Sequence, residues 1–278
     1  MKITIDGKPA DIILEKEKNL GELLGGIGDW LAGAGYSQSG LWINGESLGA
    51  SSLNDAFSLG LDTIETLDIE TSSLPLLMME ALVDTRQRVT AYCSASFEEQ
   101  RRIGQAWEES PSASFLAERM PDMFDCIARS FRGEGLAAQS LVPLVEERLR
   151  ELQDPLPELG GMESLVEGTA KRLEDLPLDI QTGKDGRAAE TVQLFSNIAE
   201  KLFRIFSLLK LEGLITDTLS IDTLSCGAFI DDFSAALKEL LAAYEVKDTV
   251  LVGDLAEYEL APRLRAFYSA IRIPRAAA

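Results

Sequence analysis

The chain has 278 residues, of which 46% are hydrophobic and 26% charged, and its formal net charge is −20. This size and composition are typical of a protein with two globular domains. Because phosphate groups and anionic lipids attract clusters of Lys and Arg, the acidic balance argues against nucleic acid and membranes as partners. We interpret it as a source of solubility, or as an acidic surface that steers a basic protein partner.

The sequence contains no histidine. Its absence excludes the Ser-His-Asp and Cys-His nucleophile systems and the H-E-x-x-H zinc pattern. Cys93, Cys126 and Cys226 lie far apart without a C-x-x-C pair, which indicates reduced, buried thiols. MKITIDG at the N-terminus lacks the pattern of a signal peptide, and no apolar run approaches the ~20 residues of a membrane span. We therefore expect a cytoplasmic protein without a cofactor, a metal site or a catalytic residue.

Strand and helix patterns alternate in the first 72 residues. KITID (2–6) and ADIIL (10–14) flank Asp6-Gly7, a dipeptide that favours a hairpin turn. The segment 19–36 then has apolar residues at helical spacing and Asn19 as its cap, with Glu22 three residues on. We expect its apolar stripe to contain Leu20, Leu23, Leu24, Ile27, Trp30 and Leu31, and its glycines Gly25, Gly26 and Gly28 to allow close packing on a sheet.

GLWING (40–45), with Glu46-Ser47-Leu48 as a short partner, and IETLDIET (64–71) predict further strands. The order β-β-α-β-β, the I-N-G-x-x-L hairpin and the stretch SLNDAFSLGLDTIETLDIE resemble the β-grasp (ubiquitin-like) superfamily. That resemblance implies a sheet that docks another protein, or a structural cap. Conjugating and sulfur-carrying members end in Gly-Gly, whereas this chain continues through TSSLPLL (71–77), so the resemblance does not imply conjugation chemistry.

We place a β-grasp domain at 1–72, a linker at 73–77 and an α-helical domain at 78–274, with no strand pairs in the last. QDPLPELGG (153–161) predicts a break between helical blocks, and LPLDIQTGKDG (176–186) predicts a loop. The segment 162–272 is expected to form a four-helix bundle. The helical periods fall at 75–93, 97–109, 112–131, 136–153, 162–176, 187–212, 216–244 and 247–271.

Two short motifs in this region do not predict a site. Gly183-Lys184 resembles the end of a phosphate-binding loop, but Leu178 and Asp185 stand where G-x-x-x-x-G-K-[ST] needs Gly and Ser or Thr. We read this segment as a turn that leads into a helix. Asp231-Asp232 point roughly 100° apart on a helix and cannot chelate one cation together, so we read them as a solvated face.

VLVGDLAEYELAPRL (250–264) concentrates acids in an apolar helix that starts near Asp248. Helical spacing puts Leu251, Leu255, Tyr258 and Pro262 in one buried seam, with the kink that an internal proline causes. The candidate site residues are Asp254, Glu257, Tyr258, Glu259 and Pro262. We weigh three interpretations of them: a structural polar cluster that meets an Arg of a neighbouring helix, a partner-binding groove, and a carboxylate pair for metal or acid–base chemistry.

QTGKDGRAAETVQLF and VLVGDLAEYELAPRL together resemble an uncharacterised bacterial family of helical-bundle domains, which has a G-K-D loop before one helix and D-L-x-E-Y-E-x-x-P in the last. The resemblance covers about residues 175–268 and implies a fold. We therefore expect an α+β, non-enzymatic interaction protein, such as an adaptor or an assembly or export chaperone. The alternative is a carboxylate-based metal-binding or hydrolytic bundle that uses Asp254, Glu257 and Glu259.

Overall fold

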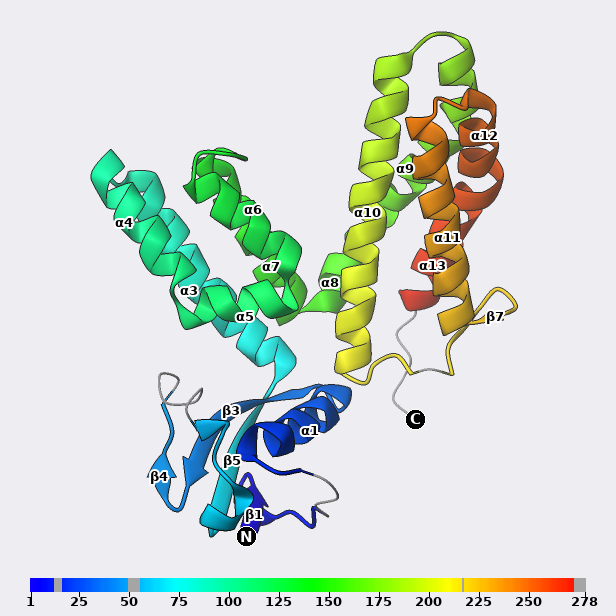
Figure 1. Cartoon of the computed structure of the whole chain (residues 1–278). Coiled ribbons are helices and arrows are strands. Elements are labelled where there is room, and N and C mark those ends of the chain that lie inside the picture. The colour runs from blue at the N-terminus through cyan, green and yellow to red at the C-terminus, as the bar shows by residue number, and fades with distance from the viewer. Residues whose placement is uncertain (13–16, 50–55, 217, 273–278) are drawn as a thin grey trace. The chain divides into compact units, whose positions relative to one another are not determined.

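The computed structural model describes residues 1–12, 17–49, 56–216 and 218–272 (Figure 1). The chain forms two compact units, Met1–Leu149 and Arg150–Ala278. Unit 1 begins with a small sheet and continues in helices, and unit 2 is almost entirely helical. The fold is thus α+β, as the sequence predicts. No helix among the described residues has the length and the apolar character needed to cross a bilayer.

The N-terminal sheet has five strands in the order β2-β1-β5-β3-β4. β1 runs parallel to β5, and the other neighbours are antiparallel. The hairpins predicted at Asp6-Gly7 and Asn44-Gly45 are confirmed, and all of these turn residues have the positive φ that a two-residue turn requires. The strands are β1 (Lys2–Ile5), β2 (Lys8–Pro9), β3 (Tyr36–Ile43), β4 (Glu46–Ser47) and β5 (Thr66–Ser73).

The second strand does not lie where the sequence predicts it. The turn pairs Lys8 directly with Ile5, so β2 occupies Lys8–Pro9 and has ended before the expected segment 10–14 begins. Proline cannot donate to a ladder, which is consistent with the short length of this edge strand. Residues 13 and 14 of the expected strand lie outside the described part of the chain.

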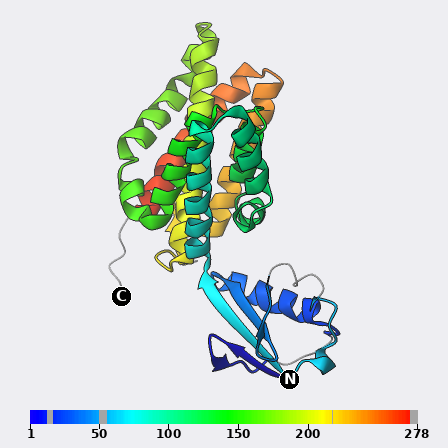
Figure 2. The same cartoon turned by 90° about the vertical axis from the view of Figure 1, so that its left-hand side faces the viewer.

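Helix α1 (Leu20–Gly33) begins at the predicted cap. Asn19 accepts the backbone N–H of Glu22 at 2.9 Å, and Glu22 accepts that of Lys18 at 2.7 Å. One face packs on the sheet (Figure 2) and buries Leu20, Leu23, Leu24, Ile27 and Leu31.

Two expectations for α1 are wrong. Trp30 is 64% exposed, because it lies roughly 80° from the centre of the apolar stripe at 100° per residue. The glycines do not serve close packing, since a Cβ added at Gly25, Gly26 or Gly28 would meet nothing within 4 Å.

Asp6 ties the β1–β2 turn to β5. Its carboxylate accepts the N–H of Thr71 at 2.8 Å and the hydroxyl at 2.7 Å, and these bonds hold the pKa of Asp6 below its ordinary value of 3.8. A carboxyl whose pKa is lowered by folding stabilises the fold above the unfolded pKa, and this stabilisation is lost as the pH falls through the folded pKa. We therefore expect Asp6→Asn to lower the melting temperature at neutral pH, with the difference from wild type shrinking below about pH 4. Melting curves across this pH range check it, and a constant difference would contradict it.

The expected linker at 73–77 is wrong, because β5 runs to Ser73 and α3 begins at Leu74. Pro75 lies in the first turn of α3, where its missing N–H costs no helical hydrogen bond. Since α3 follows the sheet without a break, the helices up to Leu149 belong to the same unit as the sheet. They are α3 (Leu74–Ser94), α4 (Phe97–Glu108), α5 (Pro111–Arg119), α6 (Pro121–Phe131) and most of α7 (Ala138–Gln153), whose last residues belong to unit 2.

The predicted helix 112–131 is two helices, α5 and α6, because Pro121 cannot continue α5. Aromatic side chains join α6 to α3 and α4. The indole of buried Trp107 stacks on Phe124, meets Phe131 edge-on with 5.4 Å between ring centroids, and donates to the Thr85 hydroxyl at 3.1 Å. The helix expected at 97–109 is thus anchored at its C-terminal end by Trp107, which is fully buried and whose indole N–H is hydrogen-bonded.

Unit 2 contains one sheet element and a set of helices around one core. The expectation of no strand pairs is wrong, because the antiparallel pair β6 (Ser220–Ile221) and β7 (Leu224–Ser225) precedes α11. The helices are α8 (Pro155–Gly160), α9 (Glu163–Gln181), α10 (Asp185–Leu211), α11 (Cys226–Glu245), α12 (Thr249–Asp254), the π-helix η2 (Leu255–Leu260) and α13 (Ala261–Ile271).

Three sequence-predicted boundaries in unit 2 are wrong. The expected break at 153–161 contains α8, which has proline in its first turn. The expected loop at 176–186 shrinks to a short turn, because α9 continues through Pro177 to Gln181. The helix expected from residue 216 starts at Cys226, where Ser225 accepts the N–H of Ala228 at 3.3 Å.

Apolar side chains of α9, α10, α11 and the segment α12–η2–α13 share one buried core. Phenylalanines dominate its centre, and Phe267 of α13 touches the rings of four others, from α10 and α11: Phe203, Phe206, Phe229 and Phe233.

Gly253 lets α12 approach α9 closely. A Cβ added at Gly253 would lie 3.2 Å from the Cβ and Cγ of Pro177. Since a proline ring cannot move aside easily, Gly253→Val is expected to lower the free energy of unfolding by about 2 kcal/mol. Gly168 in α9 is the control, because a Cβ there meets nothing within 4 Å, and Gly168→Ala is expected to stabilise by about 1 kcal/mol. Urea unfolding followed by circular dichroism measures both, and effects of the same sign would contradict this account.

Candidate functional site

The acidic segment lies where α12 passes through the π-helix η2 into α13. The N–H of Ala261 bonds to the carbonyl of Ala256, five residues back, which is the π pattern. This wide turn comes directly before Pro262. Proline has no N–H to donate, and in a regular α-helix its ring would clash with the carbonyl group four residues earlier. The segment therefore holds one residue more than an α-helix of the same length.

The extra residue moves the buried face. Val252 and Ala256 are buried before it, and Leu260 and Leu264 after it. Of the predicted buried seam, Leu255 is buried and Leu251 is partly buried. The prediction is wrong for Tyr258, which is 65% exposed, and for Pro262, which is also exposed.

The candidate acids divide into two groups. Glu259 forms an ion pair with Arg263, whose Nη2 also lies 2.7 Å from Oδ2 of Asp232 in α11. Glu259 thus belongs to a structural cluster that joins α13 to α11, and Asp232, which the sequence suggested to be solvated, is part of it.

Asp254, Glu257 and Tyr258 face outward instead. The hydrogen bond to Glu257 and the charges of Glu257 and Asp254 raise the pKa of the Tyr258 phenol, so this ring stays neutral and donates. Across residues 1–12, 17–49, 56–216 and 218–272, no three Asp, Glu or Cys side chains converge as they would around a metal ion.

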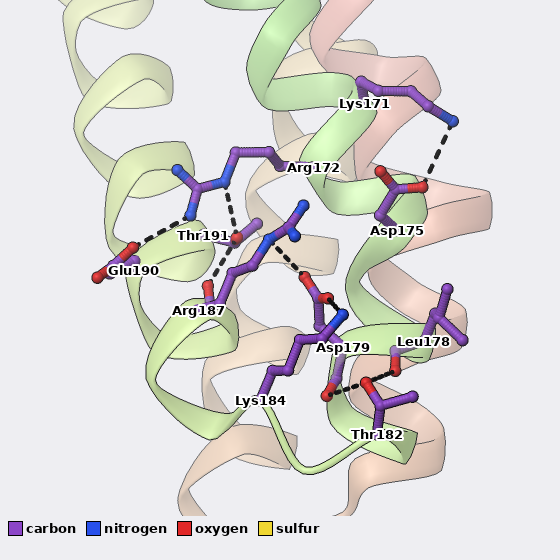
Figure 3. A network of polar contacts seen from close by, with 10 residues as sticks. All are labelled: Lys171, Arg172, Asp175, Leu178, Asp179, Thr182, Lys184, Arg187, Glu190 and Thr191. Atoms are coloured by element: carbon purple, nitrogen blue, oxygen red, sulfur yellow. Dashed lines mark hydrogen bonds and ion pairs between the residues drawn. The ribbon is translucent and has the colours of Figure 1, made fainter.

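A buried carboxylate lies at the turn between α9 and α10 (Figure 3). The Asp179 side chain is only 3% exposed, and it meets Lys184 at 3.3 Å and Arg187 at 3.0 Å. The Arg187 Nε lies close to Oδ2 without the alignment of a hydrogen bond. Thr182 and the N–H of Lys184 also bond to the Asp179 carbonyl, and Gly183 has the positive φ (71°) of a helix C-cap.

This network explains the G-K-D segment without a ligand. Asp179 places a negative charge beside the first turn of α10, where a helix macrodipole favours one. The sequence reading of a turn that leads into a helix agrees with these contacts, but Asp179 was not expected. Its only signal is a lone acid in the apolar stripe of α9.

A second buried acid, Glu151, lies within unit 2 and pairs with side chains of α10. Its side chain is 2% exposed, and Nε and Nη2 of Arg204 each lie 3.2 Å from its oxygens. Lys201 lies 3.8 Å from Glu151 and 3.1 Å from Glu158 of α8. A carboxylate held by a bidentate guanidinium is a poor general base, so this network also indicates a structural role.

The face of the sheet opposite α1 carries a different arrangement. Alternation directs Leu41, Leu67 and Ile69 into the core, so Trp42 and its cross-strand partner Asp68 point to the other face. Glu70 lies opposite Gly40 on that face. Neither acid pairs with a Lys or Arg within the described part of the chain, and Thr4 donates to one oxygen of Asp68.

Gly40 is required by this arrangement. A Cβ added there would lie 2.6 Å from Cζ3 and 2.7 Å from Cη2 of Trp42, and 3.2 Å from a carboxylate oxygen of Glu70. The indole edge and the carboxylate thus lie side by side above the glycine. We call Gly40, Trp42, Asp68 and Glu70 the open-face cluster. The alternation of apolar and polar residues in the sequence predicts that these side chains share one face of the sheet. That Trp42 and Glu70 are neighbours follows only from the pairing of β3 with β5.

Comparison with known proteins matches two separate regions of the chain, and the first region ends where the N-terminal sheet ends. Residues 1–73 match the family described as TP0873 N-terminal domain, and residues 157–270 match a domain of unknown function, DUF8042. An uncharacterized protein of Treponema pallidum (strain Nichols) is 25% identical over 265 residues, which cover 95% of this chain and 93% of that protein. No solved structure matches the chain significantly. The similarity to the Treponema pallidum protein therefore extends over most of both chains.

Proposed function

We propose that this chain is a non-enzymatic cytoplasmic interaction protein, an adaptor or an assembly or export chaperone, and that the open-face cluster is its docking surface. The observation that carries the proposal is the cluster itself. Trp42 and two acids without a basic partner in the described chain share one face of a sheet whose other face is occupied by α1. Trp42 is half-buried on this face, and aromatic side chains are enriched at protein interfaces.

The proposal includes a β-grasp fold for the first domain. Two antiparallel strands, a helix and a mixed sheet in which β1 and β5 run parallel at the centre support it. In such a fold the helix covers one face of the sheet, and the other face is available for a partner. Cys93 and Cys126 are free thiols, which supports a reducing compartment such as the cytoplasm.

The carboxylate alternative has less support. Glu259, one of the three acids of this alternative, shares the single guanidinium of Arg263 with Asp232, and Asp179 and Glu151 are each held by two cations. A general base needs a carboxylate that can accept a proton from substrate. These acids are committed to ion pairs that fasten one helix to another.

Affinity purification of the full chain from its native lysate tests the proposal. We expect a protein that wild type captures and that Trp42→Ala loses. Trp30→Ala is the matched control, since this tryptophan is 64% exposed on the helix of the same domain. Capture that is unchanged by Trp42→Ala, or that is lost equally with Trp30→Ala, would contradict docking at the open face.

A further inference from the structure

We propose that the open-face cluster binds an arginine side chain of a basic protein partner. This inference rests on the proposed docking function and names the chemistry that the partner must present. Its basis is the placement of an indole, two carboxylates and a glycine on two paired strands.

The geometry suits a planar cation. Trp42 has the best ring for a cation–π contact, and Glu70 lies beside the edge of that ring. A guanidinium can stack on an indole and present two N–H groups to a carboxylate in the same plane, which an ammonium cannot do. Thr4 holds one oxygen of Asp68, which fixes this second acid across from Trp42.

The charge of the domain agrees with this assignment. Residues 1–72 contain four basic and twelve acidic residues, a net charge of −8. Such a surface attracts a basic segment over the distance of a Debye length, about 8–10 Å at physiological salt. Neither Asp68 nor Glu70 has an ion-pair partner within the described chain, so an incoming arginine would not have to displace one.

A defined probe tests the site without knowledge of the natural partner. We choose a flexible Gly-Ser peptide with four arginines, and compare it with the same peptide carrying four lysines or four glutamates. On the full chain, the arginine peptide is expected to shift the NMR signals of the Trp42 indole N–H and of the backbone amides at Gly40, Asp68 and Glu70. The lysine peptide should shift them less, and the glutamate peptide should leave them unchanged.

Variants separate the site from general attraction. Glu70→Gln should weaken binding of the arginine peptide about fivefold, which is the effect of losing about 1 kcal/mol. Gly40→Ala changes no charge, but its added methyl group displaces the indole of Trp42 and the carboxylate of Glu70. We expect it to weaken binding of the arginine peptide by a similar factor. Asp29→Asn, which removes one charge from the exposed side of α1, should change binding less than about twofold.

Two outcomes would overturn the inference. One is a loss with Asp29→Asn equal to that with Glu70→Gln, which would mean attraction by net charge alone. The other is peptide-induced shifts that avoid the open-face cluster. The inference can also fail while the proposed function stands: a protein captured from lysate that depends on Trp42 but not on Glu70 would leave docking in place and remove arginine recognition.

Discussion

Phe267→Ala is expected to lower the free energy of unfolding of unit 2 by about 4 kcal/mol. The ring is fully buried and has contacts with Phe203 at 5.0 Å and Phe206 at 5.6 Å between centroids, besides two phenylalanines of α11. Truncation removes the transfer free energy of the ring and leaves a cavity among aromatic side chains that cannot collapse into it.

Tyr258→Ala is the matched control for this experiment, because it removes an aromatic ring that is 65% exposed on the same helical segment. We expect a change within about 0.5 kcal/mol. The three tryptophans, Trp30, Trp42 and Trp107, all lie in unit 1, so tryptophan fluorescence does not report on unit 2. Hydrogen exchange of peptides from α9 to α13 measures the effect there, and comparable losses for the two variants would show that the core is placed wrongly.

Asp179→Ala is expected to lower the free energy of unfolding by about 2 kcal/mol, because it removes a buried carboxylate from two cations that are half exposed and can be hydrated in its place. Lys184 and Arg187 would then face each other at the N-terminus of α10, where the helix macrodipole is also positive.

Asp175→Ala provides the comparison one turn earlier on α9. Its ion pair with Lys171 spans 3.5 Å and is 40% exposed on the acid side, so we expect a loss of at most about 0.5 kcal/mol. Urea unfolding followed by circular dichroism and by hydrogen exchange in α10 distinguishes the two. An Asp179→Ala protein as stable as Asp175→Ala would mean that the network in Figure 3 contributes little.

Local signals predicted the sheet domain well. Asp6-Gly7 and Asn44-Gly45 specify their turns through positive φ, and Asn19 marks the start of α1 with a side-chain bond. These features depend on neighbours within a few residues. The exposure of Trp30 and the open space around the α1 glycines depend on which other elements pack against the helix, and the spacing of apolar residues does not reveal this.

The candidate site was predicted less well, for two physical reasons. Hydrophobic spacing assumes a constant helical repeat, and the bond from Ala261 to Ala256 breaks that repeat without changing the composition. The Glu259–Arg263 pair, at a spacing of four, is visible in the sequence. The pairing of Asp179 with Lys184 and Arg187, and of Trp42 with Glu70, requires a folded turn and a strand register, which no local pattern supplies.

Chains related to this one are expected to differ in length by a single residue within η2. Deleting one residue from a π turn lets the helix close into an uninterrupted α-helix, and the side chains on both flanks keep their places in the core. The same deletion elsewhere in the segment would rotate Leu264 and Phe267 away from the other phenylalanines. An alignment gap among relatives should therefore fall between Leu255 and Leu260, and descendants of an ancestor without the extra residue should carry a final helix that lacks the π turn.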